Sequence, residues 1–195
     1  MLDYGCGTGG FLEMAQGSFG RVIGFDLNQN ICKAHLKNNW ECYNSIEEIK
    51  TEQIDIIVMF HVLEHSKKPW DLIKQISQHF VYTNYFVIEV PNTDEALNSL
   101  FHSEDYRKNH YGAQHLWYYT PDTIKSVVQR AGLTIRYETQ IQRYLLSNIF
   151  GWLNKNSIYK EVSLNIFDEV ELNKVFEEVL VKSQVADSNF LICGR

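Results

Sequence analysis

Long apolar runs, an excess of basic residues and a leading secretory segment are all missing from this sequence. No stretch is apolar enough over the ~20 residues that a bilayer requires, and no signal precedes the first glycine-rich turn, so we expect neither membrane insertion nor secretion. Lysine and arginine number 18 against 24 aspartates and glutamates, a net charge of −6 without a basic stripe. Because phosphate contacts need clustered positive charge, this balance argues against nucleic acid and favours a small-molecule partner.

Closely spaced cysteines and internal repeats are also missing. The four cysteines, Cys6, Cys32, Cys42 and Cys193, lie far apart and lack the spacing of a zinc site. We therefore expect no metal, and we expect the thiols to be reduced, as is usual for a cytoplasmic protein. The 195 residues, of which 45% are hydrophobic, predict a single domain with a substantial core.

The strongest positive signal is the glycine-rich segment at residues 3–10, Asp-Tyr-Gly-Cys-Gly-Thr-Gly-Gly, which precedes a predicted helix opening at Phe11. Glycines at alternate positions let the backbone turn sharply and approach a ligand, and a helix N-terminus offers unpaired N–H groups. Residues 22–26, Val-Ile-Gly-Phe-Asp, predict a second strand that ends in Asp26, a usual partner for a ribose diol. The alternative for Asp26 is that it caps the next helix. The pattern as a whole predicts a nucleotide-type cofactor site.

Glycine spacing alone leaves the cofactor open, because Gly5, Gly7 and Gly10 also satisfy the G-x-G-x-x-G spacing of dinucleotide-binding folds. A further glycine stands at the alternate position Gly9, however, and Asp3 precedes the turn, where it can face a cation such as the ammonium of a methionine moiety. Residues 2–9 closely resemble motif I of class I S-adenosylmethionine-dependent methyltransferases. The resemblance implies S-adenosylmethionine as cofactor and S-adenosylhomocysteine as product.

Further segments agree with that family in order and spacing. Residues 54–65 resemble its fourth strand with motif IV, residues 85–92 its fifth strand, and residues 189–193 its closing antiparallel strand. Strands that alternate with helices predict a doubly wound α/β fold with a mainly parallel seven-strand sheet, the last strand antiparallel, in three α/β/α layers. The residues that the resemblance implies for cofactor binding are Asp3, Gly5, Cys6, Gly7, Thr8, Gly9, Asp26, Leu27, Ser45, Ile46, Phe60 and His61.

Two stretches, residues 93–114 and 143–186, do not belong to this alternation, and we expect them to decide substrate choice. The first is rich in aromatic residues, which can stack on a flat ligand or simply pin the loop to the core. The second contains a predicted helix at residues 168–182 whose start reads as a capping box of Asp168 with Glu171. We expect this helix to bury the apolar stripe of Leu172, Val175, Phe176 and Val179. A substrate lid and a dimer contact are both open interpretations of these insertions.

His115 is the best candidate for a catalytic base, with Glu89 at the end of the fifth strand as the second. An oxygen, nitrogen or carbon acceptor can need a base near neutral pH, for which histidine suits. Gln114-His115 resembles the Glu-His pair of sugar C-methyltransferases, with glutamine in place of glutamate. The alternative for His115 is that it only fixes the turn before the next helix. His61 and His65 can be read as catalytic bases or as ordinary polar residues at a strand end, and we expect His61 to line the cofactor pocket together with Phe60.

The start of the sequence differs from that family, because only residues 1–3 form the first strand and the helices that usually precede it are lacking. Either the sequence is a fragment, or its start was placed too late, or the protein is naturally truncated. In the last case we expect a cofactor site that is open to water unless a second copy covers it. Three functions are compatible with the sequence. The first is methyl transfer to a sugar, quinone precursor or other metabolite. The others are a cofactor-binding module without turnover and a nicotinamide-dependent oxidoreductase.

Overall fold

The computed structural model describes residues 1–50, 54–112, 114–153 and 167–195, so parts of both insertions lie outside the described residues. Its centre is a seven-stranded sheet of order β3-β2-β1-β4-β5-β7-β6, in which β7 runs antiparallel to the other six strands. The strands are β1 (Leu2–Tyr4), β2 (Ile23–Phe25), β3 (Glu41–Tyr43), β4 (Ile56–Phe60), β5 (Tyr85–Pro91), β6 (Thr134–Ile141) and β7 (Ser188–Gly194). The predicted doubly wound α/β fold is confirmed.

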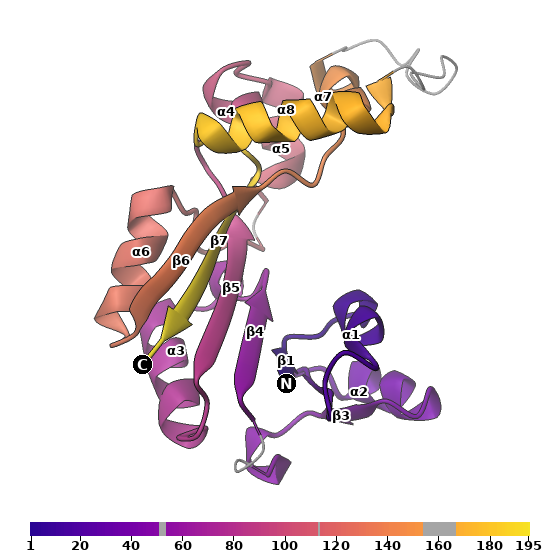
Figure 1. Ribbon diagram of the computed structural model, residues 1–195, viewed down its shortest axis with the longest axis vertical. Helices are drawn as coiled ribbons and strands as arrows, with labels where there is room; N and C mark the ends of the chain where they lie inside the picture. Colours follow the sequence, from indigo (N-terminus) through magenta and orange to yellow (C-terminus); the bar gives the residue numbers. More distant parts are fainter. Residues whose placement is uncertain (51–53, 113, 154–166) are drawn as a thin grey trace.

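Helices cover both faces of this sheet. Val58 and Met59 are neighbours in β4 and therefore point to opposite faces. Val58 packs with Leu12 of α1 (Gly10–Ala15), whereas Met59 packs with Ile73 of α3 (Pro69–His79) and Ile124 of α6 (Pro121–Arg130). The helix α2 (Gln29–Lys37) follows β2 beside α1 (Figure 1). The core thus lies in two layers, one on each side of the central strands.

The predicted helix start at Thr120 and Pro121 is confirmed. The Thr120 hydroxyl accepts from the backbone N–H of Thr123, whose own side chain accepts from the Thr120 N–H, and Pro121 occupies the first turn. Gly132, with φ of 90°, follows the end of the helix in the left-handed region. These local signals lie within a few residues of each other, which explains why the sequence reveals them.

The two insertions pack against each other into one helical unit above the carboxyl ends of the parallel strands (Figure 1). The unit contains α4 (Ala96–Ser99), α5 (Glu104–His110), α7 (Leu146–Leu153) and α8 (Val170–Lys182). Tyr106 of α5 lies edge-on to Trp152 of α7, with 5.1 Å between ring centroids. Segments that are about 45 residues apart in the sequence therefore share a small apolar core.

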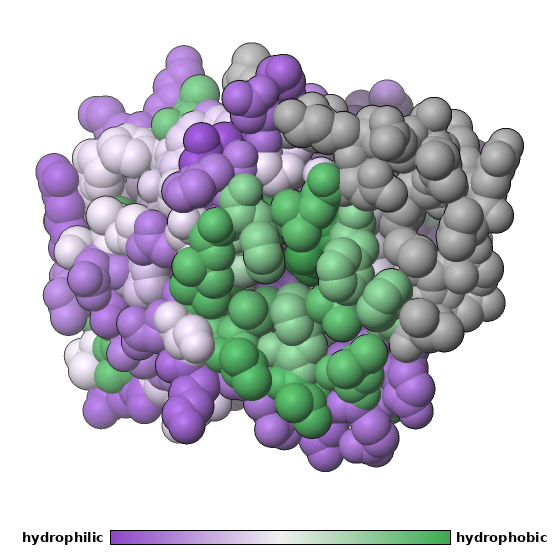
Figure 2. Space-filling model, turned by 90° about the horizontal axis from the view of Figure 1, so that it is seen from above, coloured by the Kyte–Doolittle hydropathy of each residue, from purple (hydrophilic) through white to green (hydrophobic). Residues whose placement is uncertain are grey.

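Two expectations about α8 are wrong. The N-cap is Glu169, whose side chain accepts from the Glu171 N–H, instead of Asp168. The stripe expected to be buried is largely open, because Val175 and Val179 are 57% and 56% exposed and the helix instead buries Leu180. Apolar side chains gather on this end of the molecule (Figure 2). The exposed large apolar residues of the unit are Leu100, Phe101, Leu145, Phe150, Val170, Leu172, Val175 and Val179.

The expectation that all four cysteines are reduced is also wrong. Cys32 of α2 and Cys42 of β3 form a disulfide, with Cα atoms 5.0 Å apart, because α2 folds back onto the strand that follows it. Cys6 and Cys193 are buried free thiols. In the part of the chain that the structure describes, no helix combines the length and the apolar character that a membrane crossing needs.

Candidate functional site

The glycine turn between β1 and α1 packs tightly against two other elements. Gly5 and Gly9 have φ of 86° and 87°, a region that favours glycine. A Cβ on Gly5 would lie 2.6 Å from Val62 Cγ2, and one on Gly9 would lie 2.5 Å from His35 Cε1. The Gly5 and Cys6 N–H groups both donate to the Phe25 carbonyl, at 2.7 and 3.0 Å. The turn is thus fixed against β2, α2 and the segment after β4.

Asp26 links the glycine turn to the end of β2. Its Oδ2 accepts from the Gly7 N–H at 3.1 Å and its Oδ1 accepts from the Asn28 N–H at 2.8 Å. The N-cap of α2 is Asn28, whose side chain accepts from the Asn30 N–H, so Asp26 is not the helix cap. A carboxylate has about four lone-pair sites, so two bonds leave Asp26 able to accept from a ligand.

Asp3 is a buried carboxyl that has no counter-ion among the described residues. It is 3% exposed, and no hydrogen bond or ion pair joins its side chain to any residue that the structure describes. Burial, with a further contribution from the negative charge of Asp26, raises the pKa of Asp3 from 3.8 to about 7. An ammonium group placed next to Asp3 would favour its ionised form.

The other expected cofactor residues divide into inward and outward side chains. Cys6 is buried, with its sulfur 3.8 Å from Cys42 Sγ, so it offers only its backbone. Phe60 packs edge-on against Phe11, at 4.8 Å between ring centroids. The side chains of Thr8 and Leu27 are exposed, Leu27 to 81%. Leu27 therefore presents an apolar surface next to Asp26.

Ser45 and Ile46 lie where β3 leads into a short helix, η1 (Ile46–Glu48). The Ser45 hydroxyl donates to Glu47, and Ile46 packs against the edge of the core.

His35 is a site residue that the sequence did not reveal, because its contacts are with residues far away in the sequence. Its Nε2 lies 2.8 Å from the Gly7 carbonyl, and its ring fills the space next to Gly9.

His61, at the end of β4, lies between two carboxylates. Its Nδ1–H donates to Glu64 Oε1 at 3.1 Å and its Nε2–H donates to Glu89 Oε1 at 3.2 Å. Although burial opposes the charge on the imidazole, the hydrogen bonds to Glu64 and Glu89 hold the pKa of His61 above its usual value. Both ring nitrogens are in use, so His61 joins β4 to β5 and has no free lone pair.

Glu89 is held as an anion by its neighbours. Burial opposes its charge, but the hydrogen bond from His61 and the charges of His61 and Arg143 together lower its pKa. Arg143 Nε lies 3.6 Å from Glu89 Oε1 and 3.9 Å from Asp187 Oδ1. Because its proton affinity is reduced, Glu89 is better suited to orient His61 than to accept a proton.

His115 lies beside His65, on the segment that leads into α6. The two rings are 4.9 Å apart between centroids, and burial lowers the pKa of His115. The segment is fixed to the short helix η3 (Leu63–His65), because the Glu64 carbonyl accepts from the Leu116 and Trp117 N–H groups at 2.7 and 3.2 Å. A neutral imidazole with an available lone pair is thus presented at this edge of the sheet.

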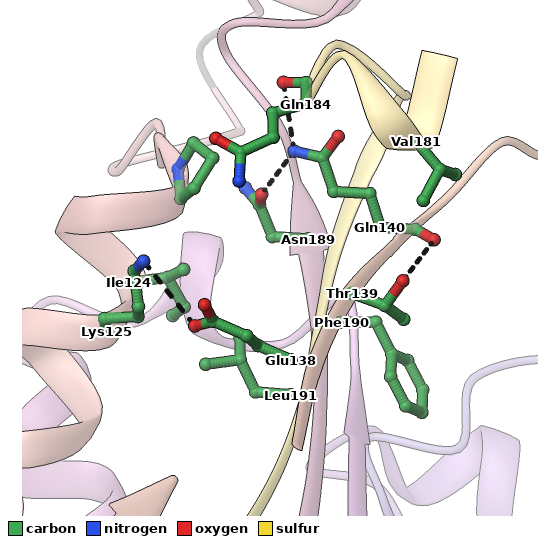
Figure 3. Close-up of a pocket in the computed structure, with 11 residues that line it drawn as sticks. Ile124, Lys125, Glu138, Thr139, Gln140, Val181, Gln184, Asn189, Phe190 and Leu191 are labelled. Atoms are coloured by element: carbon green, nitrogen blue, oxygen red, sulfur yellow. Dashed lines mark hydrogen bonds and ion pairs between the residues drawn. The ribbon is translucent and has the colours of Figure 1, made fainter. Parts of the chain in front are cut away.

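Two cavities bear on the site. A small one, of about 20 Å³, is next to His115 and is lined by Tyr106, Tyr111 and Tyr118 of the first insertion and its flank. A larger one, of about 190 Å³, lies between α6, β6, β7 and α8 (Figure 3) and includes no residue of the glycine turn. Its amides bond to one another, as Gln140 Nε2 donates to Asn189 Oδ1 at 3.1 Å. Of these two cavities, the first adjoins the candidate site.

Comparisons with known proteins agree with this geometry. A family model described as a methyltransferase domain matches residues 1–138. A search of curated proteins found no match. Among solved structures, an S-adenosylmethionine-dependent methyltransferase from Archaeoglobus fulgidus is 19% identical, with a TM-score of 0.58, over 100% of this chain and 85% of that one.

Two further solved structures differ in what their names say they act on. A cyclopropane synthase from Mycobacterium tuberculosis is 14% identical, with a TM-score of 0.58, over 100% of this chain and 77% of that one. A small RNA methyltransferase is 16% identical, also with a TM-score of 0.58, over 100% of this chain and 23% of that one. These likenesses concern the fold and do not identify an acceptor.

Proposed function

As the chain belongs to the methyltransferase domain family and is an S-adenosylmethionine-dependent methyltransferase, we propose that its acceptor is a small molecule bound beside His115. The net charge of −6, with no basic stripe, supports a small acceptor over nucleic acid. The group of aromatic rings around His115 is the observation that carries the proposal, because the hollow of about 20 Å³ between them has room for no more than about one water molecule. The tyrosine rings offer flat surfaces on which a small organic ligand can stack.

The residues at the carboxyl edge fit S-adenosylmethionine. The buried carboxyl of Asp3 has no cationic partner in the part of the chain that the structure describes, and the ammonium of the methionine moiety would supply one. Asp26 retains acceptor sites for the two ribose hydroxyls, and the exposed Leu27 with Ile46 offers apolar contact to the adenine. We propose that these side chains, with the backbone of the glycine turn, hold the cofactor.

When bound, S-adenosylmethionine supplies an electrophilic methyl carbon. The chain must then hold the acceptor in line with that carbon, which is catalysis by proximity and orientation. His115 is proposed to act through the free lone pair of its neutral imidazole. Glu89 is proposed as a positioning residue, because it holds the ring of His61 and is itself held by Arg143.

The helical unit formed by α4, α5, α7 and α8, from the two insertions, is proposed to cover the acceptor and to select it. It stands above the carboxyl ends of the strands, where ligands of open α/β sheets bind (Figure 1). A dimer contact through its apolar outer face is the alternative (Figure 2). Sedimentation of the purified chain distinguishes the two, because a cover over the acceptor does not require a second copy.

Calorimetry tests the cofactor site. We expect S-adenosylmethionine and S-adenosylhomocysteine to bind and NADH not to bind. Asp26→Ala should weaken binding at least about tenfold, since hydrogen bonds to a charged group contribute ~1.5–3 kcal/mol. Asp122→Ala, at a side chain that is 93% exposed on α6, is the matched control and should bind normally. Equal binding by both variants would contradict the assignment of Asp26.

A labelled methyl donor tests the acceptor class. The panel should include sugars, quinone precursors and other metabolites, together with RNA oligonucleotides. Transfer to a metabolite supports the proposal, whereas transfer to RNA alone would overturn it. Binding of the cofactor without transfer to any member would favour a binding module.

A further inference from the structure

Three side chains from two separate segments of the chain meet beside the small cavity that His115 lines. The carboxylate of Glu64 and the imidazoles of His65 and His115 each offer one ligand atom, and these atoms all lie within 4.8 Å of one another. Glu64 and His65 come from η3, and His115 comes from the segment before α6. The backbone bonds from Leu116 and Trp117 to the Glu64 carbonyl hold the two segments together.

The imidazole of His65 is oriented as a metal ligand would be. Its Nδ1 lies 2.9 Å from the carbonyl of Gln114, and a carbonyl can only accept, so Nδ1 carries the proton. The lone pair is therefore on Nε2, at the opposite side of the ring. Histidines that bind metals almost always donate their other N–H to a carbonyl or carboxylate in this way.

Glu64 supplies an acceptor atom with no partner. Its side chain is 1% exposed, and Oε1 is bonded to His61 Nδ1. Oε2 is buried and has no hydrogen-bond donor among the residues that the structure describes. A buried carboxylate oxygen without a partner is unfavourable, and a cation at this point would compensate its charge.

We propose that Glu64 Oε2, His65 and His115 bind a divalent transition-metal ion of the Zn²⁺ class. Two imidazole nitrogens and one carboxylate oxygen suit such ions better than Mg²⁺ or Ca²⁺, which prefer oxygen ligands alone. Three protein ligands leave a coordination position for an oxygen ligand, either water or a hydroxyl of the acceptor. That last step, the link to the acceptor, rests on the proposed function, whereas the metal site itself does not. With the ion bound, the one lone pair of the neutral His115 imidazole is occupied, so the role as a base proposed above for His115 holds for the metal-free chain alone.

The test is metal binding by the full chain after treatment with a chelator and dialysis. We expect one Zn²⁺ or Co²⁺ per chain, a visible Co²⁺ absorption band typical of nitrogen and oxygen ligands, and much weaker binding of Mg²⁺. His65→Gln and His115→Gln should each weaken Zn²⁺ binding about tenfold or more, by analogy with the losses measured for supporting residues of metal sites. His102→Gln changes an exposed histidine outside the cluster and is the matched control.

His65 is exposed, so His65→Gln should fold, and its melting curve without metal verifies this. Binding that is equal in all three variants, or no binding by the parent chain, would overturn the proposal. Calorimetry with S-adenosylmethionine on the metal-free chain separates this outcome from a failure of the cofactor site. Cofactor binding without metal binding would refute the metal site alone.

Discussion

Replacing Asp3 with asparagine tests the assignment of the cofactor site most directly. The change keeps the shape of the side chain and removes its ability to ionise. In the folded chain Asp3 is buried, no described residue provides a counter-ion, and its pKa is raised from 3.8 to about 7. Asp3→Asn should therefore behave as a permanently neutral form of the same carboxyl.

The size of the effect follows from that pKa. Below pH 3.8 the carboxyl is protonated in both the folded and the unfolded chain, so its ionisation does not affect stability. As the pH rises to about 7, the unfolded chain releases the proton while the folded chain keeps it, and the free energy of unfolding falls. The rise of the Asp3 pKa from 3.8 to about 7 corresponds to a fall of roughly 4 kcal/mol in the free energy of unfolding, and this fall is complete above pH 7. Asp3→Asn cannot ionise, so its free energy of unfolding does not fall in this way.

The assay is urea unfolding of both proteins between pH 4 and pH 8, with Asp122→Asn as the exposed control. We expect Asp3→Asn to be more stable than the parent at pH 8, by up to ~4 kcal/mol, and close to it near pH 4. Saturating S-adenosylmethionine should stabilise the parent more than the variant, because only the parent offers a carboxylate to the ammonium. Parallel pH profiles without ligand, or equal stabilisation by ligand, would refute the reasoning.

Three further changes test other parts of the site. Gly9→Ala and Gly17→Ala both place alanine at a positive φ, but of these two positions only Gly9 has a neighbouring side chain, that of His35, where the new Cβ would lie. Gly9→Ala should therefore lower the free energy of unfolding by ~1–3 kcal/mol more than Gly17→Ala. Equal losses would exclude the close contact with α2. Glu89→Gln breaks the pair of Glu89 with His61. The lowered pKa of Glu89 stabilises the folded chain fully above about pH 4.5, and the raised pKa of His61 stabilises it fully below about pH 6.5. The variant's deficit in free energy of unfolding should therefore be largest between these values and shrink on either side, and a deficit independent of pH would contradict the pairing. If turnover needs the neutral imidazole of His115, kcat/KM should be constant above about pH 6.5 and fall at lower pH. His115→Gln should remove this fall at low pH. A fall that survives in the variant belongs to another group.

The sequence revealed the elements whose signals are local. The glycine turn, the strand that ends in Asp26 and the helix start at Thr120 each depend on residues within about ten positions, and all appear in the structure. The order of strands and helices then leaves few possible sheet topologies, which is why the fold could be predicted. The start of α8 was wrong by one residue because Asp168 and Glu169 can both act as caps.

The sequence alone thus determined the fold and the cofactor class, and it predicted the edge of the sheet at which the ligand binds. The tertiary structure decided which side chains meet there. It placed His61 between Glu64 and Glu89, joined Cys32 to Cys42, and brought His115 to His65 across about 50 residues of chain. These contacts depend on how helices and loops pack back onto the sheet, and no periodicity along the sequence records that packing.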